Sequence, residues 1–314
     1  MLRLAEYSSL VRARTRRALR NRKRQRVRCF LEPEARRGSV RDLYRDLRWT
    51  FRAKRSSFES ADFAFIQKDH YDEWQARRKK SHSAVALSQL PHVSSLLVAK
   101  APLAEMVEGR PYAPETYIDA CEGQKHGIWV QKPSVGGRGS DIEFLRDPCD
   151  WQKSGYVLQR YLDTPYLVEG RKFDVRVLAK INDQGELRVH PEGLIRCANQ
   201  AFDTSSLDPR IHNSNVTFQQ REKVTQGVNT LLSRLPLAES ALKQIGDIVA
   251  DIQRLLLERD VFHGTNDFEM LGFDFLINDE EKVLLLEINQ HPGWHSYNVD
   301  TGHFYLDAID SLFD

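Results

Sequence analysis

The chain has 314 residues, of which 41% are hydrophobic and 29% are charged, a composition typical of a globular protein with a sizeable core. No stretch approaches the roughly 18–20 consecutive apolar residues of a membrane-spanning helix, so no membrane span is expected. The cysteines form no CxxC pair, which argues against structural zinc and favours a reduced, cytoplasmic protein. They are Cys29, Cys121, Cys149 and Cys197.

Charge is distributed unevenly along the chain. Residues 1–30 contain eleven Arg and Lys and one acid, Glu6, so this arm carries +10 and leaves −8 for the rest of a chain whose net charge is +2. Such an arm is typical of a tether to an acidic polymer, of a nuclear signal or of a transit peptide. A solvated arm without a partner is the fourth alternative, and all four stay open.

The hydrophobic pattern predicts a series of short elements. Residues 1–55 would hold the basic arm and a basic helix, and the short N-terminal region 56–126 would hold a buried strand at 63–66 and helices over 70–110, with a break near Pro91. Strands follow at 127–131, 141–145, 156–162, 173–181 and 187–197. A long amphipathic helix at 236–259, a β-hairpin at 270–288 and a helix at 304–313 complete the chain. This order favours an α+β fold with antiparallel sheets and packed helices.

The predicted hairpin carries the most specific signal. Asp274 interrupts its first apolar strand, and Glu287 and Asn289 end the second strand on one face, because they are two residues apart. A four-residue turn at 279–282 would place Asp274 opposite Glu287. Two carboxylates and an amide suit Mg²⁺ shared with nucleotide phosphates. The alternative is a sheet whose edges carry solvated acids.

A second polar face is predicted on the strand KFDVR, residues 172–176. Alternation places Lys172, Asp174 and Arg176 together, and Arg196 on the next strand adds a further cation. Such a face suits the binding of an anion, with the aspartate orienting the cations. The alternatives are the solvent-facing side of a half-buried strand and a surface arginine.

A glycine-rich turn separates the strands at 127–131 and 141–145. Gly137, Arg138 and Gly139 follow Lys132, and glycines let backbone amides approach phosphate oxygens closely. Because no helix follows, the segment is neither a P-loop nor a dinucleotide fingerprint. A flap over a nucleotide and an ordinary glycine hairpin are the two interpretations.

Taken in chain order, these segments resemble the tubulin–tyrosine ligase-like family of ATP-grasp ligases. The matching segments are WVQKPSVGGRGSDI (129–142), VLQRYLDTPYLVEGRKFDVRV (157–177), EGLIR (192–196), HNSNVTFQ (212–219) and FEMLGFDFLINDEEKVLLLEIN (268–289). The fourth reads HNSN where the family has HLTN. The resemblance implies that residues 127–314 form an ATP-grasp catalytic core with a glycine-rich flap over the nucleotide.

The resemblance also implies a role for each matching residue. Lys132, Gly137, Arg138 and Gly139 would bind the ATP phosphates, Gln159, Arg160 and Tyr161 would form the adenine hinge, and Lys172 would reach the phosphate tail. Asp174, Arg176 and Arg196 would order the acceptor site and stabilise an acyl phosphate. Asn215 would lie beside the nucleotide, and Asp274, Glu287 and Asn289 would bind Mg²⁺.

The implied reaction joins a free amino acid (Glu, Tyr or Gly) to a protein carboxylate, with a tubulin tail among the candidate acceptors. It consumes ATP with Mg²⁺ and releases ADP and phosphate. The protein would then be a cytoplasmic monomer that associates with the cytoskeleton. The alternatives are a carboxylate–amine ligase acting on a non-tubulin protein, peptide or metabolite, and an ATP-binding scaffold whose basic arm holds an acidic polymer.

Overall fold

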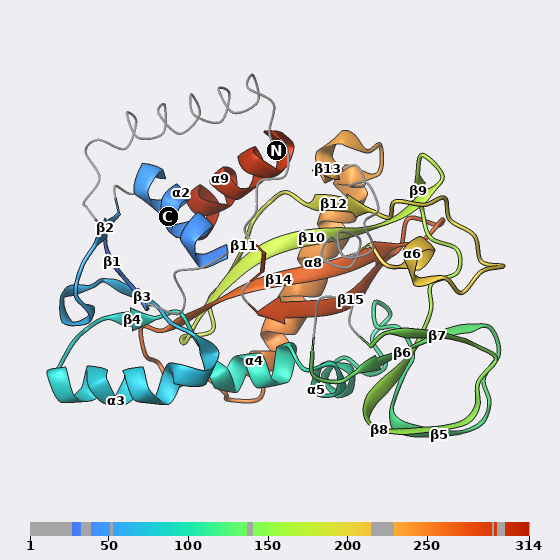
Figure 1. Cartoon of the computed structure of the whole chain (residues 1–314), viewed down its shortest axis with the longest axis horizontal. Helices are drawn as coiled ribbons and strands as arrows, with labels where there is room; N and C mark the ends of the chain where they lie inside the picture. Colours follow the sequence, from blue (N-terminus) through green and yellow to red (C-terminus); the bar gives the residue numbers. More distant parts are fainter. Residues whose placement is uncertain are drawn as a thin grey trace.

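The fold is seen in a computed structural model (Figure 1). The structure describes residues 27–32, 39–50, 53–136, 141–214, 229–290, 292–293 and 299–313. The basic arm up to residue 26, the flap residues Gly137, Arg138 and Gly139, and Asn215 lie outside the described residues. The structure combines helices with mainly antiparallel sheets, so the predicted α+β class is confirmed. No helix in the described ranges is long and apolar enough to cross a membrane.

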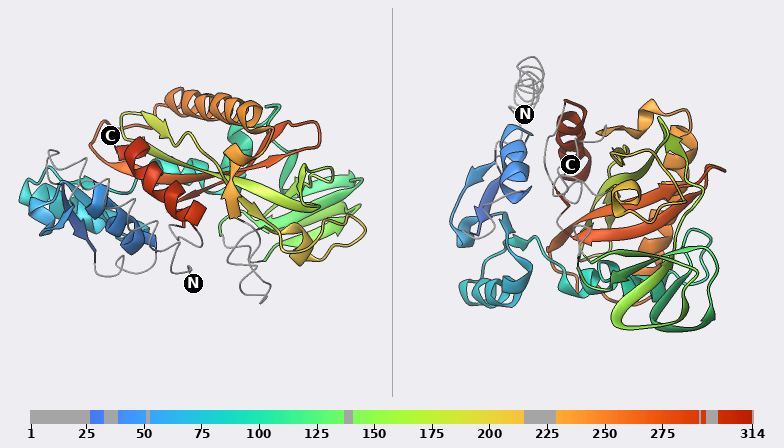
Figure 2. Two further views of the ribbon diagram at one scale, coloured as in Figure 1. Left: turned by 90° about the horizontal axis from the view of Figure 1, so that it is seen from above. Right: turned by 45° about the vertical axis from the view of Figure 1, so that its right-hand side comes forward.

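The central sheet is antiparallel throughout. Its strand order is β13 (Asn229–Leu231), β12 (Leu194–Cys197), β10 (Arg171–Asn182), β14 (Phe268–Ile277) and β15 (Val283–Gln290), and β9 (Leu167–Val168) and β11 (Leu187–Val189) also pair with β10. Helix α8 (Ala238–Leu257) packs on one face and α9 (Val299–Phe313) on the other (Figure 2, left). Alternation explains this arrangement, because Val175 and Val177 of β10 face α8 whereas Leu178 faces α9.

A second antiparallel sheet lies beside the first. Its order is β5 (Thr116–Gln124), β8 (Cys149–Arg160), β6 (Ile128–Pro133) and β7 (Glu143–Arg146). The predicted strands at 127–131 and 141–145 are confirmed. Strand β8 begins at Cys149, before the predicted start at residue 156. Its first half contains register shifts and two left-handed residues, Asp150 and Gly155. Such irregular, turn-like residues do not give the sequence pattern of a strand, so this half was not predicted.

The N-terminal region contains a small parallel sheet that the sequence did not predict. Its order is β2 (Lys54–Arg55), β1 (Arg28–Leu31), β3 (Phe63–Phe65) and β4 (Ala86–Leu87). The buried strand near 63–66 and the helices between 70 and 110 are confirmed. The helices of this region are α2 (Ser39–Thr50), η3 (Phe58–Ser60), η4 (Lys68–His70), α3 (Tyr71–Ser81), α4 (Pro91–Leu97) and α5 (Lys100–Met106).

Buried Asp267 joins this region to the start of β14. Its carboxylate accepts a 2.8 Å hydrogen bond from the backbone N–H of Leu87 and forms an ion pair with Arg78. Because Asp267 is fully buried, losing Arg78 would leave its charge without a counter-charge. This contact ties the N-terminal region to the central sheet at the start of β14.

The predicted single strand at 187–197 is wrong. Strands β11 and β12 are separated by residues 190–193, HPEG. Pro191 has no N–H to donate to a ladder. Gly193 lies so close to β10 that a Cβ atom there would be 2.6 Å from Val175 Cγ1. Two short helices, α6 (Pro209–His212) and η5 (Leu232–Arg234), follow β12 and β13, respectively, in the chain.

Candidate active site

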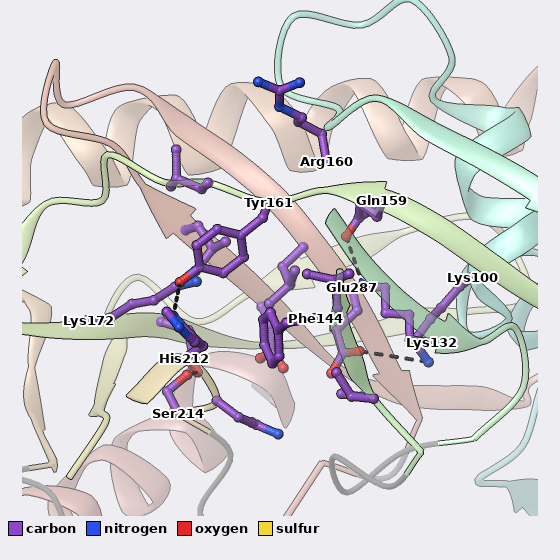
Figure 3. A pocket seen from close by; sticks show the side chains of 18 of the residues that line it. Lys100, Lys132, Phe144, Gln159, Arg160, Tyr161, Lys172, His212, Ser214 and Glu287 are labelled. Carbon is purple, nitrogen blue, oxygen red and sulfur yellow. Dashed lines mark hydrogen bonds and ion pairs between the residues drawn. The ribbon is translucent and has the colours of Figure 1, made fainter. Parts of the chain in front are cut away.

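A pocket lies between the two antiparallel sheets and brings most of the predicted site residues together (Figure 3). It encloses about 900 Å³ of space, including the part open to solvent. Its polar lining contains, among others, Lys132, Gln159, Lys172, Asp174, Arg196, Asp274 and Glu287. Arg176 and Asn289 reach the same cluster through hydrogen bonds to Asp274.

The hairpin brings the side chains of Asp274, Glu287 and Asn289 together as predicted, although its turn differs from the predicted one. Asp274 pairs with Glu287 across β14 and β15. The predicted four-residue turn is wrong, since Ile277 pairs with Val283 and five residues form the loop. A bulge between Asp274 and Phe275 restores the register. Asn289 Nδ2 donates to Asp274 Oδ2 at 2.9 Å and to Glu287 Oε1 at 3.1 Å, so the three side chains converge.

Two aspartates and two arginines form a buried ion-pair cluster in the pocket. Arg196 bridges Asp174 Oδ1 at 2.5 Å and Asp274 Oδ2 at 2.9 Å. Arg176 Nη2 donates to Asp274 Oδ2 at 2.6 Å, and its Nε donates to Oδ1. Burial acts to raise the pKa of Asp274, but Arg176 and Arg196 outweigh burial and hold that pKa below its usual range. The solvent-facing alternative for these strands is therefore wrong.

Two buried lysines line the pocket without a carboxylate partner in the part of the chain that the structure describes. Lys132 Nζ donates to the amide oxygen of Gln159 at 2.8 Å, and burial lowers the pKa of Lys132 to about 8. Lys172 Nζ lies 3.8 Å from the centre of the Tyr161 ring, and burial lowers the pKa of Lys172 to about 7. Buried cations need a counter-charge, so the pair suits an anionic ligand.

The strand expected to form the hinge presents alternate side chains to the pocket. Gln159 and Tyr161 face inward, and the Tyr161 hydroxyl lies 2.7 Å from His212 Nδ1. The exposed Arg160 side chain points away, donates to the carbonyl oxygen of His126 at 2.8 Å and packs over Trp129 (Figure 3). Only the backbone of Arg160 is therefore available to a ligand in the pocket.

Lys100 is a pocket residue that the sequence analysis missed. Its Nζ donates a 3.0 Å hydrogen bond to the carbonyl oxygen of Gly136 and lies 3.9 Å from Glu287 Oε2. It begins helix α5, within an apolar stretch that carries no site motif. Ser214 is a second residue that the sequence analysis missed, and its hydroxyl donates to Asp174 Oδ2. It could have been predicted from the short polar block around 212–215 in which it lies.

Gly272 is also part of the site, because Arg176 crosses it. A Cβ atom at Gly272 would lie 2.9 Å from Arg176 Cδ and 2.8 Å from Pro292 Cβ. We expect Gly272→Ala to lower the free energy of unfolding by about 1–3 kcal/mol through overpacking, measured by urea denaturation. The control is Gly246→Ala in α8, where a Cβ meets nothing within 4 Å and should stabilise by about 0.5–1 kcal/mol. Equal effects of the two substitutions would contradict this packing.

Comparisons with known proteins support one family. The model of the family described as "Tubulin-tyrosine ligase family" matches residues 65–314. "Probable tubulin polyglutamylase ttll-9" of Caenorhabditis elegans is 29% identical over 191 residues, which cover 52% of this chain and 46% of the relative. "Probable tubulin polyglutamylase TTLL2" of Mus musculus is 32% identical over 197 residues, which cover 54% and 35% of the respective chains. "Protein monoglycylase TTLL8" of Mus musculus is 28% identical over 213 residues, which cover 58% of this chain and 25% of the relative.

The chain thus spans less than half the length of these curated relatives. The family match nevertheless covers most of the chain and contains the described pocket lining, from Lys100 to Glu287, together with Asn289. The chain belongs to the tubulin-tyrosine ligase family.

Proposed function

We propose that the protein is an ATP-dependent ligase with an ATP-grasp core that joins a free amino acid to a protein carboxylate. The observation that carries this proposal is the pocket's charge arrangement. Buried Lys132 and Lys172 form no ion pair with an acid among the described residues, and they share the site with three carboxylates, the amide of Asn289 and two arginines. Phosphoryl transfer needs this kind of positioning and charge neutralisation more than it needs a protein nucleophile.

The oxygen-bearing residues fit Mg²⁺ bound together with a nucleotide. Asp274, Glu287 and Asn289 supply two carboxylates and one amide, and the amide lies within hydrogen-bonding distance of both carboxylates. No group of three or more His, Cys, Asp and Glu side chains that could hold a metal occurs in the described ranges. A site of few protein ligands suits Mg²⁺, which keeps several waters and binds substrate phosphates. When bound, Mg²⁺ would neutralise phosphate charge during transfer.

The chain's own residues would then bind the phosphates and the base of the nucleotide. Lys132, Lys172 and Lys100 would bind the phosphates, while Gln159, Tyr161 and the backbone of Arg160 would hold the base. The flap residues Gly137, Arg138 and Gly139, together with Asn215, would complete the nucleotide site. In the transfer, an oxygen of the acceptor carboxylate attacks the γ-phosphorus and ADP leaves. The amine of the amino acid then attacks the carbonyl carbon of the acyl phosphate, and phosphate leaves.

Asp174, Arg176 and Arg196 would serve the second step. Guanidinium groups match carboxylate and phosphate oxygens in a bidentate geometry, so the two arginines would hold the amino acid and stabilise the charge on the acyl phosphate. Asp174 would fix Arg196, to which it is bonded at 2.5 Å.

The amino acid and the acceptor are further parts of the proposal. Relatives named as polyglutamylases and a monoglycylase support Glu or Gly ahead of Tyr, and their names support a tubulin tail as the first acceptor to test. A cytoplasmic location with cytoskeletal association would follow from that acceptor. The basic arm, residues 1–30, which carries +10, would tether the enzyme to an acidic polymer.

The proposal is tested by ADP release from the purified protein with Mg-ATP, each of the twenty amino acids in turn and acidic peptide acceptors. A ligase releases ADP only when both an amino acid and an acceptor are present. Binding of ATP without release of ADP under every combination would favour the non-catalytic scaffold instead.

Nucleotide affinity should depend on pH through the buried lysines. The pKa values of Lys172 and Lys132, about 7 and about 8, mean that the two ammonium groups lose their protons between about pH 6 and 9. Because phosphates are already ionised above about pH 6, affinity for a non-hydrolysable ATP analogue should fall as pH rises through this window. Titration at several pH values measures the fall.

The control for this pH dependence is Lys172→Met, which removes the lysine with the lower pKa. The variant should bind more weakly at pH 7 and lose the part of the pH dependence closest to pH 7. An affinity that is flat from pH 7 to 9 in the wild type, or an identical slope in Lys172→Met, would contradict the assignment.

A further inference from the structure

Another, smaller pocket lies on the central sheet, away from the candidate active site. It encloses about 450 Å³ of space, including the part open to solvent, and is lined by Lys180, Asn182, Glu186, Arg188 and Phe313. Lys180 follows Lys172 by eight residues on the same face of β10, so the two lysines lie about 27 Å apart at about 3.4 Å per residue. Leu178, which lies between them in β10, packs in the core that contains α9. The smaller pocket is therefore a separate site.

Two cationic side chains meet in this pocket. Lys180 of β10 and Arg188 of β11 are directly opposite each other in the antiparallel ladder, and like charges in such a pair destabilise each other. Arg188 has a counter-ion, since its Nε lies 2.8 Å from Glu186 Oε1 and both side chains are exposed. Glu186 also accepts a 3.1 Å hydrogen bond from Asn182 Nδ2. The carboxylate of Glu186 is thus committed to Arg188 and Asn182.

The ammonium group of Lys180 has aromatic neighbours instead of an acid. Its Nζ lies 4.7 Å from the centre of the Phe313 ring and 5.3 Å from the centre of the Phe268 ring. Ring faces attract a cation but do not neutralise it. In the described ranges, Lys180 makes no ion pair, and burial together with Arg188 lowers its pKa to about 8, against a smaller opposing effect of Glu186. The ammonium group is therefore short of negative charge beside an open pocket.

The charges and the wall of the pocket indicate the kind of ligand. Lys180 and Arg188 outnumber Glu186 by one charge, so one negative charge would balance the three side chains. A carboxylate carries that charge and accepts charge-assisted hydrogen bonds from ammonium and guanidinium groups. Phe313 adds an apolar surface for the carbon chain that bears the carboxylate.

We propose that this pocket binds a carboxylate group through Lys180 and Arg188, with the carbon chain of the ligand against Phe313. The carboxylate belongs either to a small organic acid or to an acidic side chain of a peptide. The site goes beyond the proposed ligase function, because it uses none of the residues of the candidate active site.

Occupancy can be measured through the reactivity of Lys180. A bound carboxylate favours the protonated lysine, and only the unprotonated amine attacks fluorodinitrobenzene, a neutral reagent. In that reaction Nζ bonds to the ring carbon, and fluoride and a proton leave. With a pKa of about 8, about half of the Lys180 amine is unprotonated at pH 8. If the carboxylate raises the pKa by about one unit, about a tenth stays unprotonated, so labelling should slow about fivefold.

Trace labelling of the full chain at pH 8, read at each lysine by mass spectrometry after digestion, tests the proposal. Butyrate is exchanged for chloride at constant ionic strength, and should slow the labelling of Lys180 about fivefold. The internal control is Lys243 on α8, whose side chain is 81% exposed and whose labelling should not change. No slowing at Lys180, or equal slowing at Lys243, would overturn the proposal.

Arg188→Gln tests the contribution of the second cation. The substitution frees Glu186 to pair with Lys180, so Lys180 should label more slowly than in the wild type without butyrate, and butyrate should slow it further by less than about twofold. The matched control is Arg254→Gln on α8, which removes another exposed arginine paired with a glutamate and should behave as the wild type. A full butyrate effect in Arg188→Gln would overturn the assignment.

Two further comparisons identify the source of the carboxylate. Protection of Lys180 by an end-blocked triglutamate peptide at a lower carboxylate concentration than butyrate would support an acidic peptide as the ligand, whereas stronger protection by butyrate would support a small acid. Asp314 follows Phe313 in the chain and lies outside the described residues. Faster labelling of Lys180 in Asp314→Asn without added carboxylate would show that the chain fills the pocket itself, and would overturn the proposal.

Discussion

Glu287→Gln is expected to leave the fold intact and to reduce turnover by about 100-fold or more. The substitution is nearly isosteric, and the Glu287 side chain is 22% exposed, so little packing is lost. It removes the negative charge of the residue that lies opposite Asp274 in the hairpin and that accepts a hydrogen bond from Asn289 at 3.1 Å. Steady-state ADP release at saturating Mg-ATP measures the loss, and thermal unfolding verifies the fold.

Glu281→Gln is the matched control for Glu287→Gln. It makes the same chemical change on an exposed residue of the loop in the same hairpin, and should leave turnover unchanged. Raising the concentration of Mg²⁺ should partly rescue Glu287→Gln if a weakened metal site is the cause. Full activity of Glu287→Gln at ordinary Mg²⁺ would remove this residue from the mechanism.

Asp274→Asn should have the largest effect on stability, a loss of about 3–5 kcal/mol in the free energy of unfolding. Asp274 is 1% exposed and receives hydrogen bonds from Arg176, Arg196 and Asn289. Loss of its charge would leave the Arg176 guanidinium buried without a counter-ion, and the new amide group would point a donor at other donors. Urea denaturation monitored by circular dichroism measures the change.

The control for Asp274→Asn is Asp279→Asn, on the exposed loop of the same hairpin. Surface substitutions of this kind change stability by less than about 0.5 kcal/mol. If Asp274→Asn unfolded at the same urea concentration as the control, the buried ion pairs would contribute nothing to stability, and the cluster would be explained by function alone.

Periodicity was sufficient to predict much of the site. In β10, a period of two places Lys172, Asp174 and Arg176 on one face between two antiparallel neighbours. Lys172 and Asp174 line the pocket, and Arg176 joins them through its hydrogen bonds to Asp274. The pairing of Asp274 with Glu287 was predicted from the wrong turn. The loop is one residue longer than expected, and the bulge compensates for this difference.

The missed features depend on contacts between distant parts of the chain. Strand β4 has two residues, Ala86 and Leu87, and is a strand only because β3 lies beside it. Lys100 enters the pocket because α5 lies against the flap, as the hydrogen bond from its backbone N–H to Ser134 O shows. Motif resemblance grouped Arg160 with its neighbours, whereas strand alternation already places its side chain on the opposite face.

The central claim is that this pocket forms an amide bond between an amino acid and a protein carboxylate. The most direct test is the intact mass of tubulin tail peptides after incubation with the protein, Mg-ATP and one amino acid at a time, with Glu287→Gln as the inactive control. We predict that a peptide gains the mass of one or more amino-acid residues with the wild type alone. The claim would be contradicted if the protein binds Mg-ATP but modifies neither the peptides nor full-chain tubulin with any of the twenty amino acids.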